Sequence, residues 1–274
     1  MTAAGIFLTH RRSPRIRRHF RRLVEESGSL VDWHFVYSHD TGARPTTSLV
    51  ADDPAEVLAT RHAAMERNGG VQGGYVDTLL LPLLRSLAAD QLWAIEYDVD
   101  YAGRWSDLFD QFADNDADLL TTTLLRRRDQ EQWPWWASAG SPSWVAEEQW
   151  LRSLNPLMRL SRPLVNAYCV AMADPAWRGH YEFTLPTLAS VSGFVVEDLG
   201  GDGPFTPDAR RGRIYVGRTP AGRPDDQTFG FRPVRRRYFH ERPEAFSRAG
   251  LVYHPVKPGV PAWTRETMNV RDTT

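Results

Sequence analysis

Short apolar runs alternate with amphipathic stretches through the first two hundred positions of the chain. Six runs have the length and composition of buried β-strands: 5–10, 31–39, 92–99, 117–126, 164–173 and 194–199. Six stretches have the pattern of helices: 13–27, 53–68, 73–88, 103–115, 143–160 and 181–193. In the first helix, Ser13 is placed to cap the N-terminus and Pro14 to occupy the first turn. This alternation predicts an α/β fold with a mostly parallel central sheet between layers of helices.

The pattern changes after about residue 200. Glycine, proline and arginine dominate from there to about residue 250 without a clear period, which predicts a long surface excursion. No linker or internal repeat separates this part from the rest. We therefore expect one domain over 1–274, with an irregular arm and C-terminal tail over about 201–274.

The composition narrows the class of protein. Hydrophobic residues make up 42% of the chain, and 33 basic against 34 acidic residues leave a net charge of −1, which gives no general attraction to nucleic acid. No run is apolar for long enough to span a bilayer, and the first residues do not resemble a secretory signal, so we expect a cytoplasmic protein without a transmembrane segment. The single cysteine, Cys169, is expected to be an inert residue of the core.

Three acids follow one another at the end of the run 92–99. Glu96, Asp98 and Asp100 are two residues apart, so in an extended chain their side chains would share one side. Ligands of open α/β sheets bind beyond the carboxyl ends of the strands, where these acids lie. The pattern favours a positively charged partner, although acids at a strand end can also be solvated turn residues or helix caps.

This order of strand, acid-x-acid, valine, glycine-containing turn and helix resembles the metal motif of nucleotide-sugar glycosyltransferases of the GT-A fold. The resemblance implies a Rossmann-type, three-layer sandwich, with a nucleotide-binding half over about 1–100 and an acceptor-side half over about 101–200. It places Glu96 and Asp98 on the motif, with Asp98 and Asp100 as the alternative pair. It also implies a Mn²⁺ or Mg²⁺ cofactor bound directly by Asp98, with Glu96 facing the ribose or acting through water. The implied donor is a nucleoside-diphosphate sugar, most commonly a UDP-sugar. Oxygen ligands suit such cations.

The same resemblance gives a role to an acid that opens a helix. Glu182 lies at the start of the predicted helix 181–193, where inverting members of the family carry the general base that takes the proton of the acceptor hydroxyl. An acid in a first turn also stabilises the helix dipole without any catalytic role. Glu197 and Asp198, which end the next predicted strand, are rival catalytic acids or else form a capped turn before Gly200.

Two further segments complete the expected site. GT-A enzymes often close the metal site with a histidine near the end of the chain, and His254 has that position; Lys257, the only lysine in the sequence, could meet a phosphate. His10 and Arg11 follow the first strand, where the fold would place the diphosphate. Two basic segments, 206–218 and 231–242, could reach phosphates or keep a long loop soluble.

Tryptophans gather in the segment 131–144. Trp133, Trp135 and Trp136 could present aromatic faces to the unidentified acceptor, or they could form a small core beneath the loop.

Two functions compete with glycosyl transfer. A sugar-phosphate nucleotidyltransferase would need a glycine-rich loop after the first strand, which the segment 8–17 lacks, and a non-catalytic carbohydrate- or protein-binding domain would leave the acids solvated.

Overall fold

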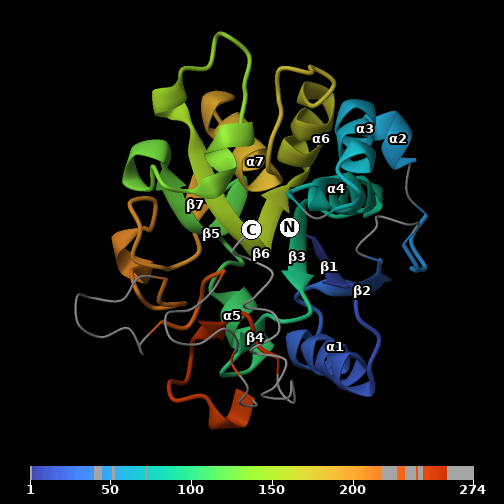
Figure 1. Cartoon of the computed structure of the whole chain (residues 1–274). Helices are drawn as coiled ribbons and strands as arrows, with labels where there is room; N and C mark the ends of the chain where they lie inside the picture. Colours follow the sequence, from blue (N-terminus) through green and yellow to red (C-terminus); the bar gives the residue numbers. More distant parts are fainter. Residues whose placement is uncertain are drawn as a thin grey trace, which may run out of the picture.

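A six-stranded sheet forms the centre of the protein, with strand order β2-β1-β3-β6-β5-β7 (Figure 1). The computed structural model describes residues 2–39, 45–50, 53–71, 73–217, 227–231, 239 and 243–257. The strands of the sheet are β1 (Ala3–Thr9), β2 (Asp32–Tyr37), β3 (Gln91–Glu96), β5 (Leu119–Arg126), β6 (Leu151–Ser161) and β7 (Val196–Asp198).

Five strands of this sheet point the same way. β1 pairs in parallel with both β2 and β3, β7 pairs in parallel with β5, and only β6 runs antiparallel to its neighbours β3 and β5. The mostly parallel α/β sheet predicted from the alternation of strands and helices is therefore confirmed. The carboxyl ends of β1, β2 and β3 lie at one edge of the sheet. The acidic turn, residues 96–100, follows β3 and begins at this edge.

Helices cover both faces of the sheet. They are α1 (Pro14–Ser27), α2 (Pro54–Val57), α3 (Ala59–Arg67), α4 (Val76–Ser86), α5 (Trp105–Asp110), α6 (Arg162–Ala171) and α7 (Tyr181–Val191). Side chains alternate between the two faces of a strand, so Ile6 joins a core with α4, α6 and α7, whereas Phe7 joins a core with α1 and α5. These two cores make the three layers that the GT-A resemblance implied (Figure 1).

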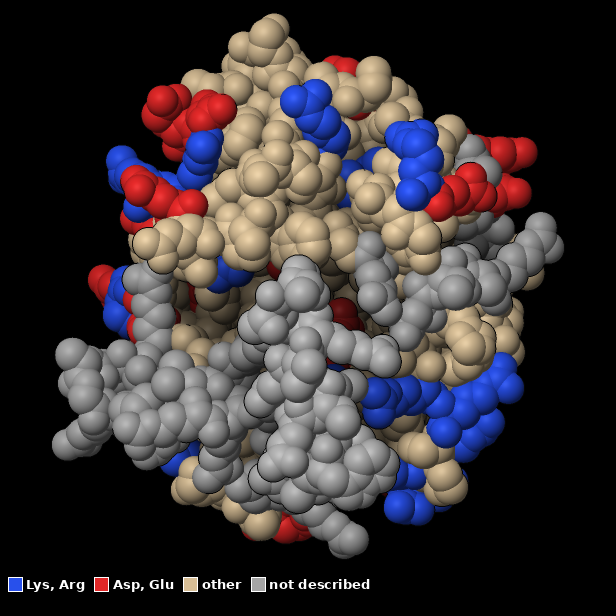
Figure 2. All heavy atoms as spheres, viewed as in Figure 1, with Lys and Arg blue, Asp and Glu red and all other residues tan. Residues whose placement is uncertain are grey.

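The start of α1 follows the predicted capping pattern. Ser13 Oγ accepts a hydrogen bond from the Ile16 backbone nitrogen at 3.2 Å, and Pro14 occupies the first turn. Ile16 and Leu23 are buried against the sheet, and basic side chains gather on the surface over this helix (Figure 2). The arginine-rich helix is thus the first crossover helix of the sheet.

Two predictions about secondary structure are wrong. Residues 143–160 are not a helix, because 151–161 form β6 between β3 and β5; residues 164–173 are not a strand, because 162–171 form α6. All eleven residues of β6 are buried, so the strand shows no alternation of polar and apolar side chains. α6 begins as α1 does, with a serine cap: Ser161 Oγ accepts a hydrogen bond from the Leu164 nitrogen at 3.3 Å.

A two-stranded ribbon brings the C-terminal part of the chain to the acidic turn. β8 (Val252–Tyr253) pairs antiparallel with β4 (Asp100–Tyr101), next to β3 in the sequence. Much of the expected irregular arm consists of loops and short 3-10 turns: η4 (Asp208–Arg210) and η6 (Pro243–Ala245). Of the second basic segment, 231–242, only residues 231 and 239 lie within the described part of the chain. Among the described residues, no helix combines the length and the apolar character needed to cross a bilayer.

Candidate functional site

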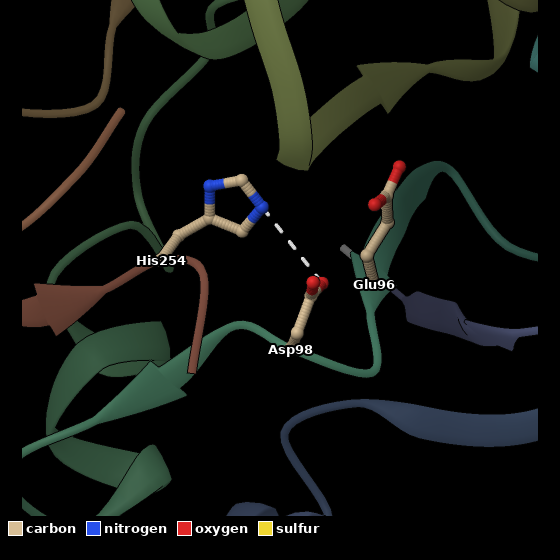
Figure 3. Close-up of side chains that lie close together, drawn as sticks. All are labelled: Glu96, Asp98 and His254. Atoms are coloured by element: carbon tan, nitrogen blue, oxygen red, sulfur yellow. Dashed lines mark ion pairs between the residues drawn. The ribbon is translucent and has the colours of Figure 1, made fainter. Parts of the chain in front are cut away.

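The acidic turn separates the three carboxylates that the sequence places in a row. Glu96 is the last residue of β3, and a turn closed by a hydrogen bond from the Val99 nitrogen to the Glu96 oxygen (3.0 Å) leads into β4. Because the chain turns instead of continuing as a strand, the acids do not all share one side. Glu96 and Asp98 face His254, and ligand atoms of these three residues lie within 4.8 Å of one another (Figure 3). We call this group the candidate cation site.

His254 reaches the site through the ribbon. Its backbone follows β8, and the Val256 nitrogen donates to the Asp98 carbonyl at 2.7 Å. The ring Nδ1 lies 2.9 Å from the Gly230 carbonyl oxygen, which can only accept, so Nδ1 carries the proton. The other nitrogen, Nε2, therefore presents a lone pair, and it lies 3.8 Å from Asp98 Oδ1. A backbone carbonyl that orients a histidine in this way is typical of metal sites.

Asp98 is held in its charged form. Its side chain is buried, which alone would raise its pKa, but the positive charges of His254, when its ring is protonated, and of Lys257 outweigh burial and lower the pKa below the ordinary value. Lys257 Nζ lies 3.1 Å from Asp98 Oδ2. The second oxygen, Oδ1, is buried and has no hydrogen-bond partner among the residues that the structure describes. A buried carboxylate oxygen without a partner is costly, so this atom is a natural ligand for a cation.

Glu182 lines the same cavity as the candidate cation site. It is in the first turn of α7, and its Oε1 accepts a hydrogen bond from the Asn155 nitrogen at 3.3 Å. Burial raises the pKa of Glu182 to about 7. Burial, and then the charges of Asp98 and Glu182, raise the pKa of Glu96 to about 8. The site thus combines a charged carboxylate at Asp98 with two carboxyl groups that exchange protons near neutral pH.

These side chains line one cavity of about 390 Å³. His10 and Lys257 line it as well, and Figure 2 shows acidic atoms on the floor of a hollow in this face. A second cavity of about 410 Å³ continues past the ends of β1 and β2 and shares His10, Glu96 and Tyr97 with the first. Arg11 is exposed, and its Nε donates to His10 Nε2 at 3.3 Å, so it touches the site through His10.

Asp100 does not join the candidate cation site. Its Oδ1 accepts a hydrogen bond from Arg22 Nη1 at 2.7 Å, and its Oδ2 lies 3.8 Å from His19 Nδ1. Arg22 and His19 both belong to α1. The expected use of Asp100 as a metal ligand therefore finds no geometric support. The reason is the turn after Glu96, which sends the next alternate side chain toward α1.

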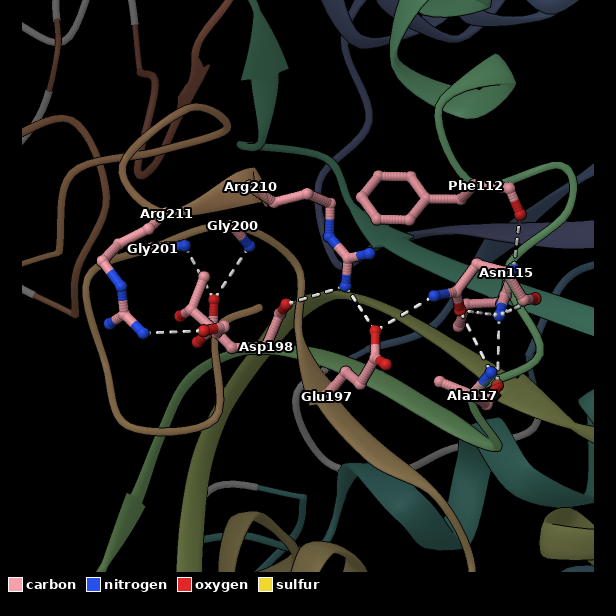
Figure 4. Close-up of polar contacts among 11 residues, drawn as sticks. Phe112, Asn115, Ala117, Glu197, Asp198, Gly200, Gly201, Arg210 and Arg211 are labelled. Atoms are coloured by element: carbon pink, nitrogen blue, oxygen red, sulfur yellow. Dashed lines mark hydrogen bonds and ion pairs between the residues drawn. The ribbon is translucent and has the colours of Figure 1, made fainter. Parts of the chain in front are cut away.

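Glu197 and Asp198 belong to a structural network instead of the cavity (Figure 4). Asp198 is fully buried, and its Oδ1 accepts hydrogen bonds from the backbone nitrogens of Gly200 (2.9 Å) and Gly201 (2.7 Å). Glu197 accepts from Asn115 Nδ2 at 3.0 Å and pairs with Arg210. Of the two readings of this segment, the geometry favours the capped turn over the catalytic acid.

The tryptophan segment divides between core and surface. Trp133 and Trp136 are buried in the core beside α7, whereas Trp135 keeps 39% of its surface exposed. Trp135 lies against His180, whose ring centroid is 5.2 Å from that of Trp135. His180 lines the cavity two residues before Glu182, and the sequence pattern gave it no role. The only local signal for it is its place as N-cap of α7.

Comparisons with known proteins do not identify the function. The sequence matches no protein-family model and no curated protein. Among solved structures, the apo form of mouse xyloside xylosyltransferase 1 is similar at 12% sequence identity and a TM-score of 0.35, over 73% of this chain and 86% of that chain. This likeness is coarse and carries no conclusion about function.

Proposed function

We propose that this protein is a divalent-metal-dependent glycosyltransferase that moves a sugar from a nucleoside-diphosphate donor, such as a UDP-sugar, to an acceptor hydroxyl. The observation that carries the proposal is the cavity at the carboxyl edge of the sheet. There the candidate cation site, the ammonium of Lys257 and the partly ionised Glu182 converge. Departure of a diphosphate needs positive charge near the leaving oxygens, and deprotonation of an acceptor needs a base with a pKa near that of the medium.

The residues present fit Mn²⁺ or Mg²⁺. Two carboxylates and one imidazole offer mostly hard donors, and the buried Asp98 Oδ1 has no hydrogen-bond partner among the described residues. Asp98 and His254 would hold the cation, with Glu96 beside them. When bound, such a cation supplies a Lewis acid that stabilises negative charge on the diphosphate.

The remaining groups can bind the donor and accept the proton of the acceptor. Lys257 can donate to a phosphate oxygen from the position in which it now meets Asp98, and Glu96 can accept a hydrogen bond from a donor hydroxyl. In an inverting transfer, the acceptor oxygen bonds to the anomeric carbon while the bond from that carbon to the phosphate oxygen breaks. The electron pair of that bond leaves with the diphosphate, and the hydroxyl proton passes to Glu182.

Titration calorimetry with UDP tests the proposal on the full chain. Wild-type protein should bind UDP more tightly with Mn²⁺ than without it, and Asp98→Asn should lose this difference because a neutral amide is a weaker ligand. Asp110→Asn, which changes an exposed acid on α5, serves as the matched control and should keep the difference. An Asp98→Asn protein with the wild-type response to Mn²⁺ would remove the metal assignment.

A further inference from the structure

His180 is fixed beside Glu182 by close packing. Its side chain is 13% exposed and lines the cavity, and its ring stacks on Tyr181 with centroids 5.6 Å apart. Gly74, with φ of +104°, makes room for it, because a Cβ at that position would lie 2.4 Å from the ring. The Tyr181 nitrogen donates to the Gly74 carbonyl at 2.9 Å, which ties the two segments together.

The hydrogen bonds of His180 define which ring nitrogen carries its proton. The Glu182 backbone nitrogen donates to Nδ1 at 3.2 Å, so Nδ1 must be the unprotonated acceptor. Burial, together with the charges of Arg61 and Arg152, lowers the pKa of His180 to about 3, so the ring is neutral near pH 7. The 3.6 Å approach between Nδ1 and the Glu182 carboxylate is therefore not an ion pair.

The proton of the neutral ring consequently lies on Nε2. Among the described residues no acceptor bonds to this nitrogen, and it is not one of the fully buried atoms that lack a partner. A ring that lines the cavity thus keeps one N–H donor available to a ligand. The same ring approaches Glu182, the group that would accept a hydroxyl proton, through Nδ1, and both residues line the cavity.

Trp135 is held at the side of His180 by a rigid loop. It lies in the 3-10 turn η2 (Pro134–Ser138), where Trp136 is buried and its Nε1 donates to the Gln130 carbonyl at 2.9 Å. Two backbone hydrogen bonds of 3.1 and 3.0 Å join Gly140 to Arg178, two residues before His180. The exposed indole is not itself among the residues that line the cavity, but these contacts hold it against His180, which is.

We propose that His180 and Trp135 form the acceptor subsite and that the acceptor is a sugar. One hydroxyl of the sugar meets Glu182, an adjacent oxygen accepts the His180 Nε2–H, and the C–H face of the ring packs on Trp135. A lone serine or threonine hydroxyl would satisfy Glu182 but would leave the imidazole donor and the indole face without partners, which a selective site avoids. This inference rests on the proposed function for the role of Glu182.

Saturation-transfer NMR with simple glycosides tests the subsite. The probes are the methyl β-pyranosides of xylose, glucose, galactose and mannose, with N-acetylserine amide as the single-hydroxyl probe, each with and without UDP and Mn²⁺. At least one glycoside should bind, and the serine probe should not. Trp135→Ala should weaken the dissociation constant by about three- to tenfold, as expected for loss of one aromatic contact. Trp144→Ala, at another exposed tryptophan (62%), should leave it unchanged.

A histidine variant separates binding from folding. His180→Asn keeps a side chain that can cap α7 but shortens the reach of its donor, so it should fold and still weaken glycoside binding. Binding of the serine probe alone, or of no glycoside under either condition, would overturn the subsite, as would wild-type affinity in both Trp135→Ala and His180→Asn. If glycosides bind normally while the affinity for UDP does not change with Mn²⁺, the acceptor subsite is supported and the proposal of metal-dependent transfer is refuted.

Discussion

Replacing Glu182 by glutamine removes an ionisable group that the fold buries. The pKa of Glu182 rises from 4.5 to about 7 on folding because its side chain, 12% exposed, loses contact with water. At 1.36 kcal/mol per pH unit, this difference costs the folded state roughly 3 kcal/mol once the group is fully ionised. Glutamine has nearly the same shape and no charge, so Glu182→Gln should recover about that amount.

The stability gained by Glu182→Gln should increase as the pH rises. Between pH 4.5 and about 7, the folded protein holds a proton on Glu182 that the unfolded chain has lost, so the stability of the wild type falls as the pH rises through this window. Below pH 4.5 both states are protonated and the variant has no advantage. Above about pH 7 the advantage is complete.

Thermal unfolding followed by circular dichroism measures this difference. At pH 8 the Glu182→Gln protein should melt about 6–12 °C above the wild type, from roughly 3 kcal/mol at 2–4 °C per kcal/mol, and at pH 4.5 the two should melt together. Glu25→Gln, at an exposed glutamate on α1, is the control and should show no such dependence on pH. A Glu182→Gln protein with the same advantage at both pH values, or with none, would refute the claim that this carboxyl is buried at an energetic cost.

Three further measurements follow from the contacts of the candidate site, and a fourth from the buried ion pair between Arg61 on α3 and Asp77 on α4. Release of UDP from a donor should increase as pH rises through about 7, where Glu182 loses its proton, and a flat profile would exclude it as base. Lys257→Met should weaken UDP about tenfold or more in calorimetry, since it removes a charged donor; unchanged affinity would place the ammonium away from phosphate. Asp100→Asn should lower the free energy of unfolding by about 1–3 kcal/mol yet leave the UDP response to Mn²⁺ intact. Arg61→Leu should cost about 3–5 kcal/mol in denaturant unfolding by leaving Asp77 buried without its cation, and a change below 1 kcal/mol would contradict the buried pair.

Local patterns in the sequence located most of the sheet and failed where burial was complete. Leucines at 151, 154, 157 and 160 recur every third residue, which is typical of a helix, yet this segment is the central strand β6. Its polar side chains also find partners that no local rule reveals: Arg159 donates to the carbonyls of Phe112 and Asn115. For α6 a usable signal was present, because Ser161 followed by Pro163 repeats the start signal of α1.

In the candidate site too, local sequence predicts some residues, whereas others are brought in only by contacts between distant parts of the chain. Glu96 and Asp98 could be predicted because they adjoin one strand end, but the turn after Glu96 directs Asp100 to Arg22 on α1, 78 residues away in the sequence. The meeting of Asp98 with His254 depends on the pairing of β4 with β8, which only tertiary structure specifies. His180 escaped prediction because its role depends on its tautomer, which is set by a backbone hydrogen bond.

The ribbon formed by β4 and β8 also affects how the protein is made. Asp100 and Tyr253 are paired in space, so the ribosome must synthesise everything between them before the ribbon can close. The last strand of the sheet, β7, ends at Asp198, so it is made before His254 and Lys257, whose imidazole and ammonium later face Asp98. A chain that ended before Val252 would lack β8 together with His254 and Lys257, and so could not assemble the candidate cation site.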